Sequence, residues 1–264
     1  MRAEMRPRVL VLHARGTNRD REAAMACELA GGDPEIVHMN QLVAGERRLS
    51  DYQMFVLPGG FSYGDDLGGG KLWATVLRHR LEDDLRAFVD AGKPVLGICN
   101  GFQVLVKMGL LPGPLDGAAD GWQQTATLTR NDSTRFECRW VYLQPEPESR
   151  CIFTKGLEEP IYCPVAHGEG KFVARDEALL DALEARGLVA LRYVGPDGQP
   201  ASYPWNPNGS QRHIAGICNA QGTVFGLMPH PEDHVVPFQH PRFHRGERGM
   251  SGLPLFKNGI RYVS

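Results

Sequence analysis

Residues 94–109 read Pro-Val-Leu-Gly-Ile-Cys-Asn-Gly-Phe-Gln-Val-Leu-Val-Lys-Met-Gly. Pro94–Cys99 is a short apolar run, which is typical of a strand buried on both faces of a parallel sheet. Phe102–Met108 is expected to form a helix that ends at Gly109. The Gly-x-Cys-x-Gly spacing between them predicts a nucleophile elbow, in which two glycines allow a sharp turn that exposes Cys99. These residues therefore predict a strand-turn-helix unit with a thiol at its turn.

The place of Cys99 at the start of a helix favours its thiolate, because the helix dipole and free N–H groups stabilise negative charge there. The plain alternative is a buried structural cysteine at the end of a strand. The cysteines that lack such a frame are interpreted as structural or incidental: Cys27, Cys138, Cys151, Cys163 and Cys218. None forms a CxxC pair, so neither a zinc ribbon nor a thioredoxin-type motif is indicated.

Strands and helices alternate on both sides of this unit. Strands are expected at Arg8–Ala14, Glu35–Met39 and Met54–Leu57, with helices over about Glu22–Ala30 and Lys71–Ala91. After Pro114 shorter strands, some in hairpins, and one helix at Asp176–Arg186 are expected. These strands are Thr125–Thr129, Glu137–Gln144, Ile161–Val165, Lys171–Ala174, Leu188–Val194, Ile214–Cys218 and Thr223–Met228. The predicted fold class is α/β, a mostly parallel central sheet flanked by helices, with additional antiparallel strands in the second half.

Composition narrows the class of protein. The chain has 264 residues, and we interpret it as a single domain over 1–264, of which about 237–264, where no clear period is visible, is a C-terminal extension. A formal charge of -2 argues against a nucleic-acid partner, which normally requires a basic excess. No apolar run approaches the roughly 18 residues of a membrane span, so we expect no membrane association and a cytoplasmic protein with reduced thiols. Glycine and proline, 31 and 19 residues, are in excess, which indicates many tight turns.

A second group of chemically active residues is His230-Pro231-Glu232, which follows the expected strand Thr223–Met228. A catalytic thiol needs a base, and the base needs an orienting group. Residues two apart in an extended segment point the same way, so His230 and Glu232 can lie side by side. The alternative is a metal site made by spaced histidines, but Pro231 in the first turn weakens the case for a helical zinc motif. We therefore predict no metal and interpret the remaining histidines of this segment as a solvated tail: His234, His240 and His244.

A third group is the glycine-rich loop Pro58–Asp65, at the carboxyl end of an expected strand, where open α/β sheets bind ligands. Glycines let backbone N–H groups approach an oxyanion closely, although a plain glycine turn is the simpler interpretation of this loop alone. The nearby Gly68–Lys71 resembles a phosphate loop, but Leu72 stands where that loop requires Ser or Thr. No nucleotide-binding fingerprint is therefore identified.

Taken together, the three groups resemble the class I, triad-type glutamine amidotransferases. That family has a Pro-Gly-Gly oxyanion loop, a Gly-x-Cys-x-Gly-x-Gln elbow and a late His-Pro-Glu, which match Pro58–Gly60, Gly97–Gln103 and His230–Glu232 in order. The resemblance implies a flavodoxin-like fold and a catalytic triad of Cys99, His230 and Glu232. It also implies that the oxyanion hole and the glutamine pocket are formed by Gly59, Gly60, Phe61, Asn100, Gln103, His167 and Glu169.

Longer motifs are similar to one branch of that family, the glutaminase subunits of phosphoribosylformylglycinamidine synthase. They are Gly59–Asp65, Gly97–Gln103, Pro164–Gly170, Met228–Glu232 and Gly252–Asn258. The resemblance implies hydrolysis of L-glutamine and delivery of ammonia to an ATP-dependent synthetase subunit, with a small accessory subunit. It implies no cofactor in this chain, with ATP and Mg expected on the synthetase.

The sequence departs from the branch at three places. The loop His13–Asp20 keeps only the Gly, Asn and Asp of the usual pattern, Leu67–Gly70 lacks the usual Arg, and Asp233 stands where Arg is common. Two other functions stay open at this point. One is a glutaminase or related cysteine hydrolase that serves a different synthetase, and the other is a non-catalytic binding module on the same fold.

Overall fold

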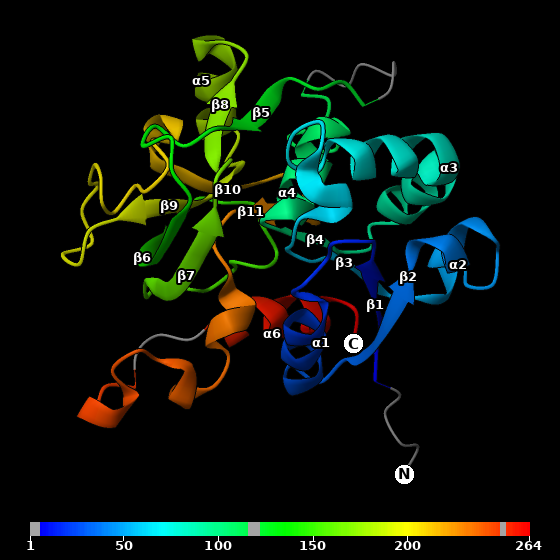
Figure 1. Ribbon diagram of the computed structural model, residues 1–264, viewed down its shortest axis with the longest axis horizontal. Helices are drawn as coiled ribbons and strands as arrows, with labels where there is room; N and C mark the ends of the chain where they lie inside the picture. The colour runs from blue at the N-terminus through cyan, green and yellow to red at the C-terminus, as the bar shows by residue number, and fades with distance from the viewer. Residues whose placement is uncertain (1–5, 116–121, 249–251) are drawn as a thin grey trace.

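The computed structural model describes residues 6–115, 122–248 and 252–264, and a nine-stranded sheet forms its centre (Figure 1). The strand order is β2-β1-β3-β4-β11-β10-β9-β6-β7. The strands are β1 Arg8–His13, β2 Asp33–His38, β3 Met54–Leu57, β4 Val95–Ile98, β6 Glu137–Pro145, β7 Ile161–His167, β9 Val189–Val194, β10 Ile214–Cys218 and β11 Val224–Leu227. Strands β5 (Ala126–Thr129) and β8 (Lys171–Ala174) pair in a separate two-stranded sheet.

The sheet is parallel from β2 to β11 and antiparallel from β11 to β7. Every residue of β3, β4 and β11 is buried, as their continuous apolar runs require in the middle of a covered sheet. This arrangement confirms the α/β fold class. Because β1, β3, β4 and β11 run in the same direction, the segments that follow them meet at one edge. The expected elbow, glycine loop and His-Pro-Glu segment are therefore brought together there.

The helices are α1 Asp20–Leu29, α2 Met39–Val43, α3 Lys71–Asp90, α4 Asn100–Lys107, α5 Glu177–Ala185 and α6 Leu253–Tyr262. Helices α3 and α4 lie on one side of the parallel strands, and α1 packs with α6 on the other (Figure 1). Across the described ranges, no helix combines the length and the apolar character that crossing a bilayer demands.

Helix α6 was not predicted, because the tail shows no clear period. Pro254 lies in its first turn, and Leu255, Phe256 and Ile260 are buried. Gly259 is required by packing, since an added Cβ would lie 2.5 Å from the Phe153 ring. Glycine and asparagine weaken a helix locally, so tertiary contacts rather than propensity stabilise this one.

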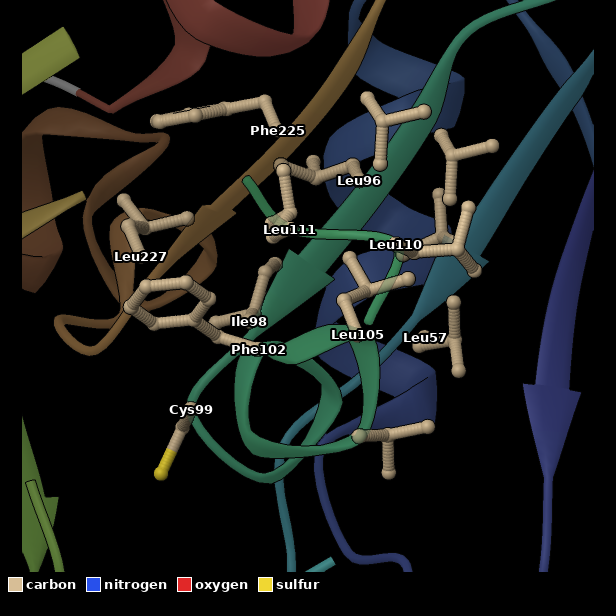
Figure 2. Packing of buried hydrophobic residues seen from close by; sticks show 14 of the residues in the cluster. Leu57, Leu96, Ile98, Cys99, Phe102, Leu105, Leu110, Leu111, Phe225 and Leu227 are labelled. Carbon is tan, nitrogen blue, oxygen red and sulfur yellow. The ribbon is translucent and has the colours of Figure 1, made fainter. Parts of the chain in front are cut away.

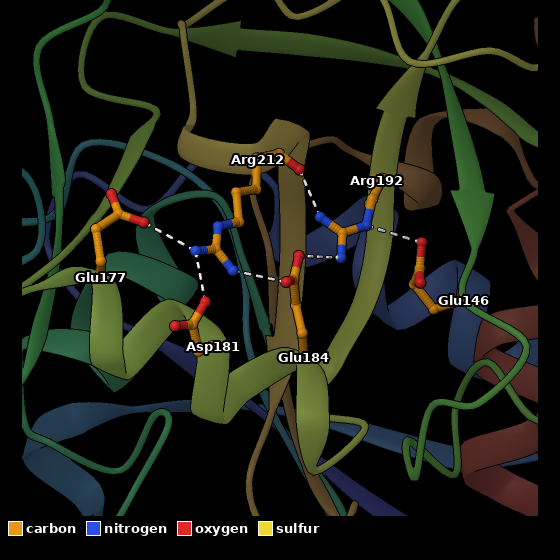
Figure 3. Close-up of polar contacts among 6 residues, drawn as sticks. All are labelled: Glu146, Glu177, Asp181, Glu184, Arg192 and Arg212. Carbon is orange, nitrogen blue, oxygen red and sulfur yellow. Dashed lines mark hydrogen bonds and ion pairs between the residues drawn. The ribbon is translucent and has the colours of Figure 1, made fainter.

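An ion-pair network fixes α5 to the segment before β10 (Figure 3). The Arg212 guanidinium contacts three α5 carboxylates at 2.6–2.8 Å: Glu177, Asp181 and Glu184. Arg192 on β9 contacts Glu184 at 2.8 Å and Glu146 at 2.9 Å. Glu184 is shared by both arginines, so the network joins α5, β9 and the turn that carries Arg212.

Candidate functional site

The elbow places Cys99 between β4 and α4 in a strained conformation. Its φ of 50° and ψ of −105° are uncommon for a residue with a side chain. A Cβ on Gly97 would lie 2.5 Å from Leu105 Cδ1, and one on Gly101 would lie 2.7 Å from the carbonyl carbon of Leu57. Gly97 therefore lets β4 and α4 approach closely, and Gly101 lets α4 approach the end of β3. In Figure 2 the sulfur of Cys99 points away from the apolar residues beneath the elbow.

His230 and Glu232 lie beside Cys99 after β11. His230 Nδ1 is 2.6 Å from Glu232 Oε1, and the Glu232 side chain is fully buried. The turn is anchored because the His230 N–H donates to Pro164 O at 2.8 Å. Gly59 brings the loop after β3 to the same point, since a Cβ there would lie 2.6 Å from His230 Cε1 and 3.5 Å from Cys99 Cβ. The fold thus brings the expected Cys, His and Glu together.

The electrostatics of His230 follow from this arrangement. Burial alone lowers its pKa, but the Glu232 carboxylate and the Cys99 sulfur outweigh burial and hold the pKa of His230 well above its ordinary value. The imidazolium form is therefore stabilised between a carboxylate and the nucleophile. This is the arrangement that a proton-carrying base requires.

The loop after β3 leaves a free backbone N–H near the nucleophile. Gly59 O accepts from the N–H groups of Asn18 and Arg19, and the Phe61 N–H donates to Gly16 O at 2.9 Å. Within the described part of the chain, the Gly60 N–H donates to no other backbone group. Gly60 has a φ of 149°, and a Cβ there would lie 2.7 Å from Thr17 Cα, so only glycine fits. Asn100 begins α4, and its N–H is among those that a helix leaves without an intrahelical acceptor.

A cavity of about 180 Å³ opens next to Cys99. It is smaller than the roughly 300–1,000 Å³ of clefts that take drug-sized ligands, so it suits a small metabolite. Six of the predicted site residues line it: Gly60, Phe61, Cys99, Gln103, His167 and Glu169. Gly59 and Asn100 are not among the lining residues, but Gly59 packs against His230 and Cys99, and Asn100 hydrogen-bonds Gln103. Sequence reasoning missed Asp65 and Phe136 as lining residues, although Asp65 belongs to a motif it had noted.

Gln103 and Asn100 are engaged in a network that shapes this cavity. Asn100 Nδ2 donates to Gln103 Oε1 at 2.8 Å, and Gln103 Nε2 donates to the backbone oxygen of Glu169 at 2.7 Å. The Glu169 carboxylate accepts from the Gly69 N–H at 2.9 Å. Both polar ends of Gln103 are therefore used within the protein, and its predicted contact with substrate stays a prediction.

His167 is held by a residue whose role the sequence did not reveal. His167 Nδ1 lies 3.2 Å from Asn131 Oδ1, and both side chains are buried. Burial, with a smaller contribution from His230, lowers the pKa of His167 to about 3, so its ring is neutral. No local motif marks this role of Asn131, because His167 and Gly170, which its side chain contacts, lie more than 35 positions away in the sequence.

The interpretation of the later histidines as a solvated tail is wrong for two of them. His234 and His240 are buried, and their rings lie 5.5 Å apart. They pack against Trp140 and Tyr162, whose positions on β6 and β7 only the sheet pairing determines. His244, in contrast, contacts Phe243 in the following short turn.

Three neighbouring side chains at the site could together hold a metal ion. His230, Glu232 and Asp233 each bring one ligand atom to within 4.8 Å of the others. His230 Nδ1 and Glu232 Oε1, however, already engage each other, and Asp233 lies 3.4 Å from Arg19 Nε. Arg19 belongs to the altered loop after β1, so two departures from the family pattern meet in one ion pair. The absence of a metal stays a prediction.

The fold and this Cys-His-Glu site define a triad-type glutamine amidotransferase. Residues 6–263 match the model of the CobB/CobQ-like glutamine amidotransferase domain, and the chain belongs to that family. Phosphoribosylformylglycinamidine synthase subunit PurQ of Treponema denticola is 52% identical over 98% of this chain and 100% of that protein. The subunit PurQ of Dehalococcoides mccartyi is 45% identical over 97% of both chains. A chain of the PurLQS structure from Thermotoga maritima superposes with a TM-score of 0.73 at 33% identity, covering 98% of this chain and 100% of that one.

Proposed function

We propose that this chain is the glutaminase subunit of a phosphoribosylformylglycinamidine synthase. It hydrolyses L-glutamine to glutamate and ammonia and passes the ammonia to a synthetase subunit. That subunit converts formylglycinamide ribonucleotide to formylglycinamidine ribonucleotide in purine (IMP) biosynthesis. The observation that carries the proposal is the buried Cys99–His230–Glu232 group beside a small cavity, in a chain that matches PurQ subunits over nearly its whole length.

The chemistry follows from the positions of these groups. The Cys99 sulfur attacks the side-chain carbonyl carbon of glutamine, and the N–H groups of Gly60 and Asn100 stabilise the oxyanion. Losing one such donor typically costs about 3–4 kcal/mol of transition-state stabilisation. His230 then gives a proton to the amide nitrogen and the C–N bond breaks. Ammonia departs, and the glutamyl group remains bound to Cys99 as a thioester. Water, deprotonated by His230, attacks the thioester, and the C–S bond breaks to release glutamate. Glu232 holds the His230 ring in place throughout.

The partners are part of the proposal. The described residues lack a nucleotide-binding fingerprint, so ATP and Mg are assigned to the synthetase subunit, with no cofactor in this chain. Free ammonia is lost to water, which makes a sealed contact with the synthetase necessary. We include a small accessory subunit because the structural relative is a PurLQS complex. Neither a nucleic acid nor a membrane has a role, and the proposed location is the cytoplasm.

The test compares the native chain with Cys99→Ala in the presence of the cognate synthetase. The native complex should convert the ribonucleotide with glutamine, and the variant complex should do so only with added ammonium. Equal glutamine-dependent turnover by native and variant chains would overturn the proposal. If glutamine is hydrolysed but no ribonucleotide is converted, the alternative of a glutaminase that serves another synthetase gains support. A chelator should leave glutamine hydrolysis by the native chain unchanged, and a loss of that activity would indicate a metal at His230, Glu232 and Asp233.

A further inference from the structure

The loop after β3, residues 58–70, closes one side of the catalytic cavity and brings an acidic side chain to it. Asp65 of this loop and Glu169, which follows β7, both line the cavity. Glu169 Oε2 accepts from the Gly69 N–H at 2.9 Å, so the loop is joined to the segment after β7 at this point. Residues 67–70 of the loop carry no charged side chain. A cation that balances the two carboxylates must therefore come from another element.

One face of α4 meets this loop with three polar side chains. Asn100, Gln103 and Lys107 are spaced by three and four residues, which places them on the same side of the helix. Asn100 Nδ2 donates to Asp65 Oδ1 at 3.2 Å. Gln103 packs against Gly69, where an added Cβ would lie 2.5 Å from its amide nitrogen. Lys107 Nζ donates to Gly69 O at 2.6 Å. Helix α4 thus holds the loop at two points, and Lys107 is the charged member of this face.

The Lys107 ammonium interacts with both carboxylates of the cavity wall. The side chain is partly buried, and burial lowers its pKa, whereas the charges of Glu169 and Asp65 act in the opposite direction. The pKa of Asp65 is raised by burial and by the Glu169 charge, and Lys107 acts to lower it. The two acids therefore repel each other, and Lys107 offsets that repulsion. Salt screens such partly buried charges less than it screens exposed ones.

We propose that Lys107 is a positioning residue that fixes the shape and the charge of the cavity in which glutamine is hydrolysed. It holds the loop against Glu169 through its hydrogen bond to Gly69 O, and its charge keeps Asp65 and Glu169 close together at the cavity wall. This inference rests on the proposed glutaminase function. Lys107 is not among the lining residues, and it contacts neither the triad nor the proposed oxyanion donors. Its loss should therefore weaken glutamine binding more than it slows the chemical steps.

Steady-state glutamine hydrolysis with the synthetase present tests this role. Lys107→Met keeps the apolar stem of the side chain but removes the ammonium. It should raise KM for glutamine about 5- to 100-fold, the range for losing one hydrogen bond from a charged group, while kcat changes by less than about threefold. Lys107→Arg restores a cation of similar reach and should keep KM within about threefold of native. Lys71→Met is the matched control, because Lys71 is an exposed lysine directly after the same loop, and it should leave both constants unchanged.

An unchanged KM in Lys107→Met would overturn the proposal, whether or not kcat falls. An equal rise of KM in Lys71→Met would also overturn it, because the effect would then follow net charge rather than the contact with the loop. A lower Tm with an unchanged KM would instead assign Lys107 to the last turn of α4, where a basic side chain favours the helix dipole.

A second variant keeps the test decisive if Lys107→Met does not fold. Lys107→Gln retains a donor for Gly69 O but has no charge, so it should still raise KM for glutamine, and a native KM would refute the role of the charge. The two proposals fail differently. If the native chain hydrolyses no glutamine even with the synthetase present, the proposed function fails. Native hydrolysis with the same KM in the Lys107 variants refutes this inference alone.

Discussion

Replacing Gly101 with alanine should slow catalysis strongly. The substitution removes no catalytic group, but the added methyl group displaces the backbone segments that position the nucleophile and the oxyanion loop. The added Cβ would lie 2.7 Å from the carbonyl carbon of Leu57 and 2.8 Å from its Cβ, with the carbonyl oxygen nearer still. Ordinary contact begins at 3.4 Å, so α4 and β3 must separate by at least about 0.7 Å. Leu57 directly precedes Pro58–Gly60, and Gly101 follows Cys99 by two residues. The separation therefore moves the nucleophile and the oxyanion loop apart.

Two quantities follow from this displacement. A shift approaching 1 Å at reacting groups costs about a hundredfold in rate, and the overpacking itself destabilises the fold by about 1–3 kcal/mol. The assay is steady-state glutamine hydrolysis with the synthetase present, together with thermal unfolding of each variant. Gly156→Ala is the matched control, because its Cβ meets nothing within 4 Å and adds only left-handed strain, about 1–2 kcal/mol. A folded Gly101→Ala variant with hydrolysis within twofold of native would refute the steric account of the elbow.

Three further outcomes are expected. Glu232→Gln should lower the pKa of His230, because burial then acts without the opposing carboxylate. The alkaline limb of the pH–rate profile should therefore move to lower pH, and kcat should fall about 10²- to 10⁴-fold. An alkaline limb at the native pH would contradict the conclusion that Glu232 raises the pKa of His230. The pKa of His167 is lowered from 6.5 to about 3, so the unfolded chain binds more protons between these values and stability falls as the pH drops through that range. Urea unfolding at pH 7 and pH 5 should show this loss, and His167→Gln should show a smaller loss. Arg212→Met should lower Tm, and should do so more than Arg175→Met, which removes contact with a single exposed carboxylate; equal Tm values would exclude the network as a stabilising element.

The local elements of the fold were predictable because their causes are local. The strand β4, the turn at Cys99 and helix α4 are specified by an apolar run, two glycines and a following helical segment within sixteen residues. The same reasoning located β1, β3 and β11, because their short, continuous apolar runs are typical of strands that are buried on both faces of a parallel sheet. The order of motifs along the chain then sufficed to predict one nucleophile, one base and one orienting carboxylate.

Helix α6 and the buried histidines were not predictable in this way. Gly259 and Asn258 weaken the helical pattern of α6, and the helix exists because Phe153 and the core accept its apolar face. His234 and His240 lie in a polar segment, yet Trp140 and Tyr162 cover them. Each outcome depends on side chains that come from more than 70 positions away.

The sequence by itself determined the class of fold and the need for glycine at the elbow, and it predicted the nucleophile, base and carboxylate, because each motif is formed by neighbouring residues. The tertiary structure alone decided that His167 is buried as a neutral ring beside Asn131, and that Gln103 is hydrogen-bonded at both ends of its side-chain amide. The physical reason is that hydrogen bonds and burial set protonation and orientation, and the partners that provide them come together only when the sheet forms.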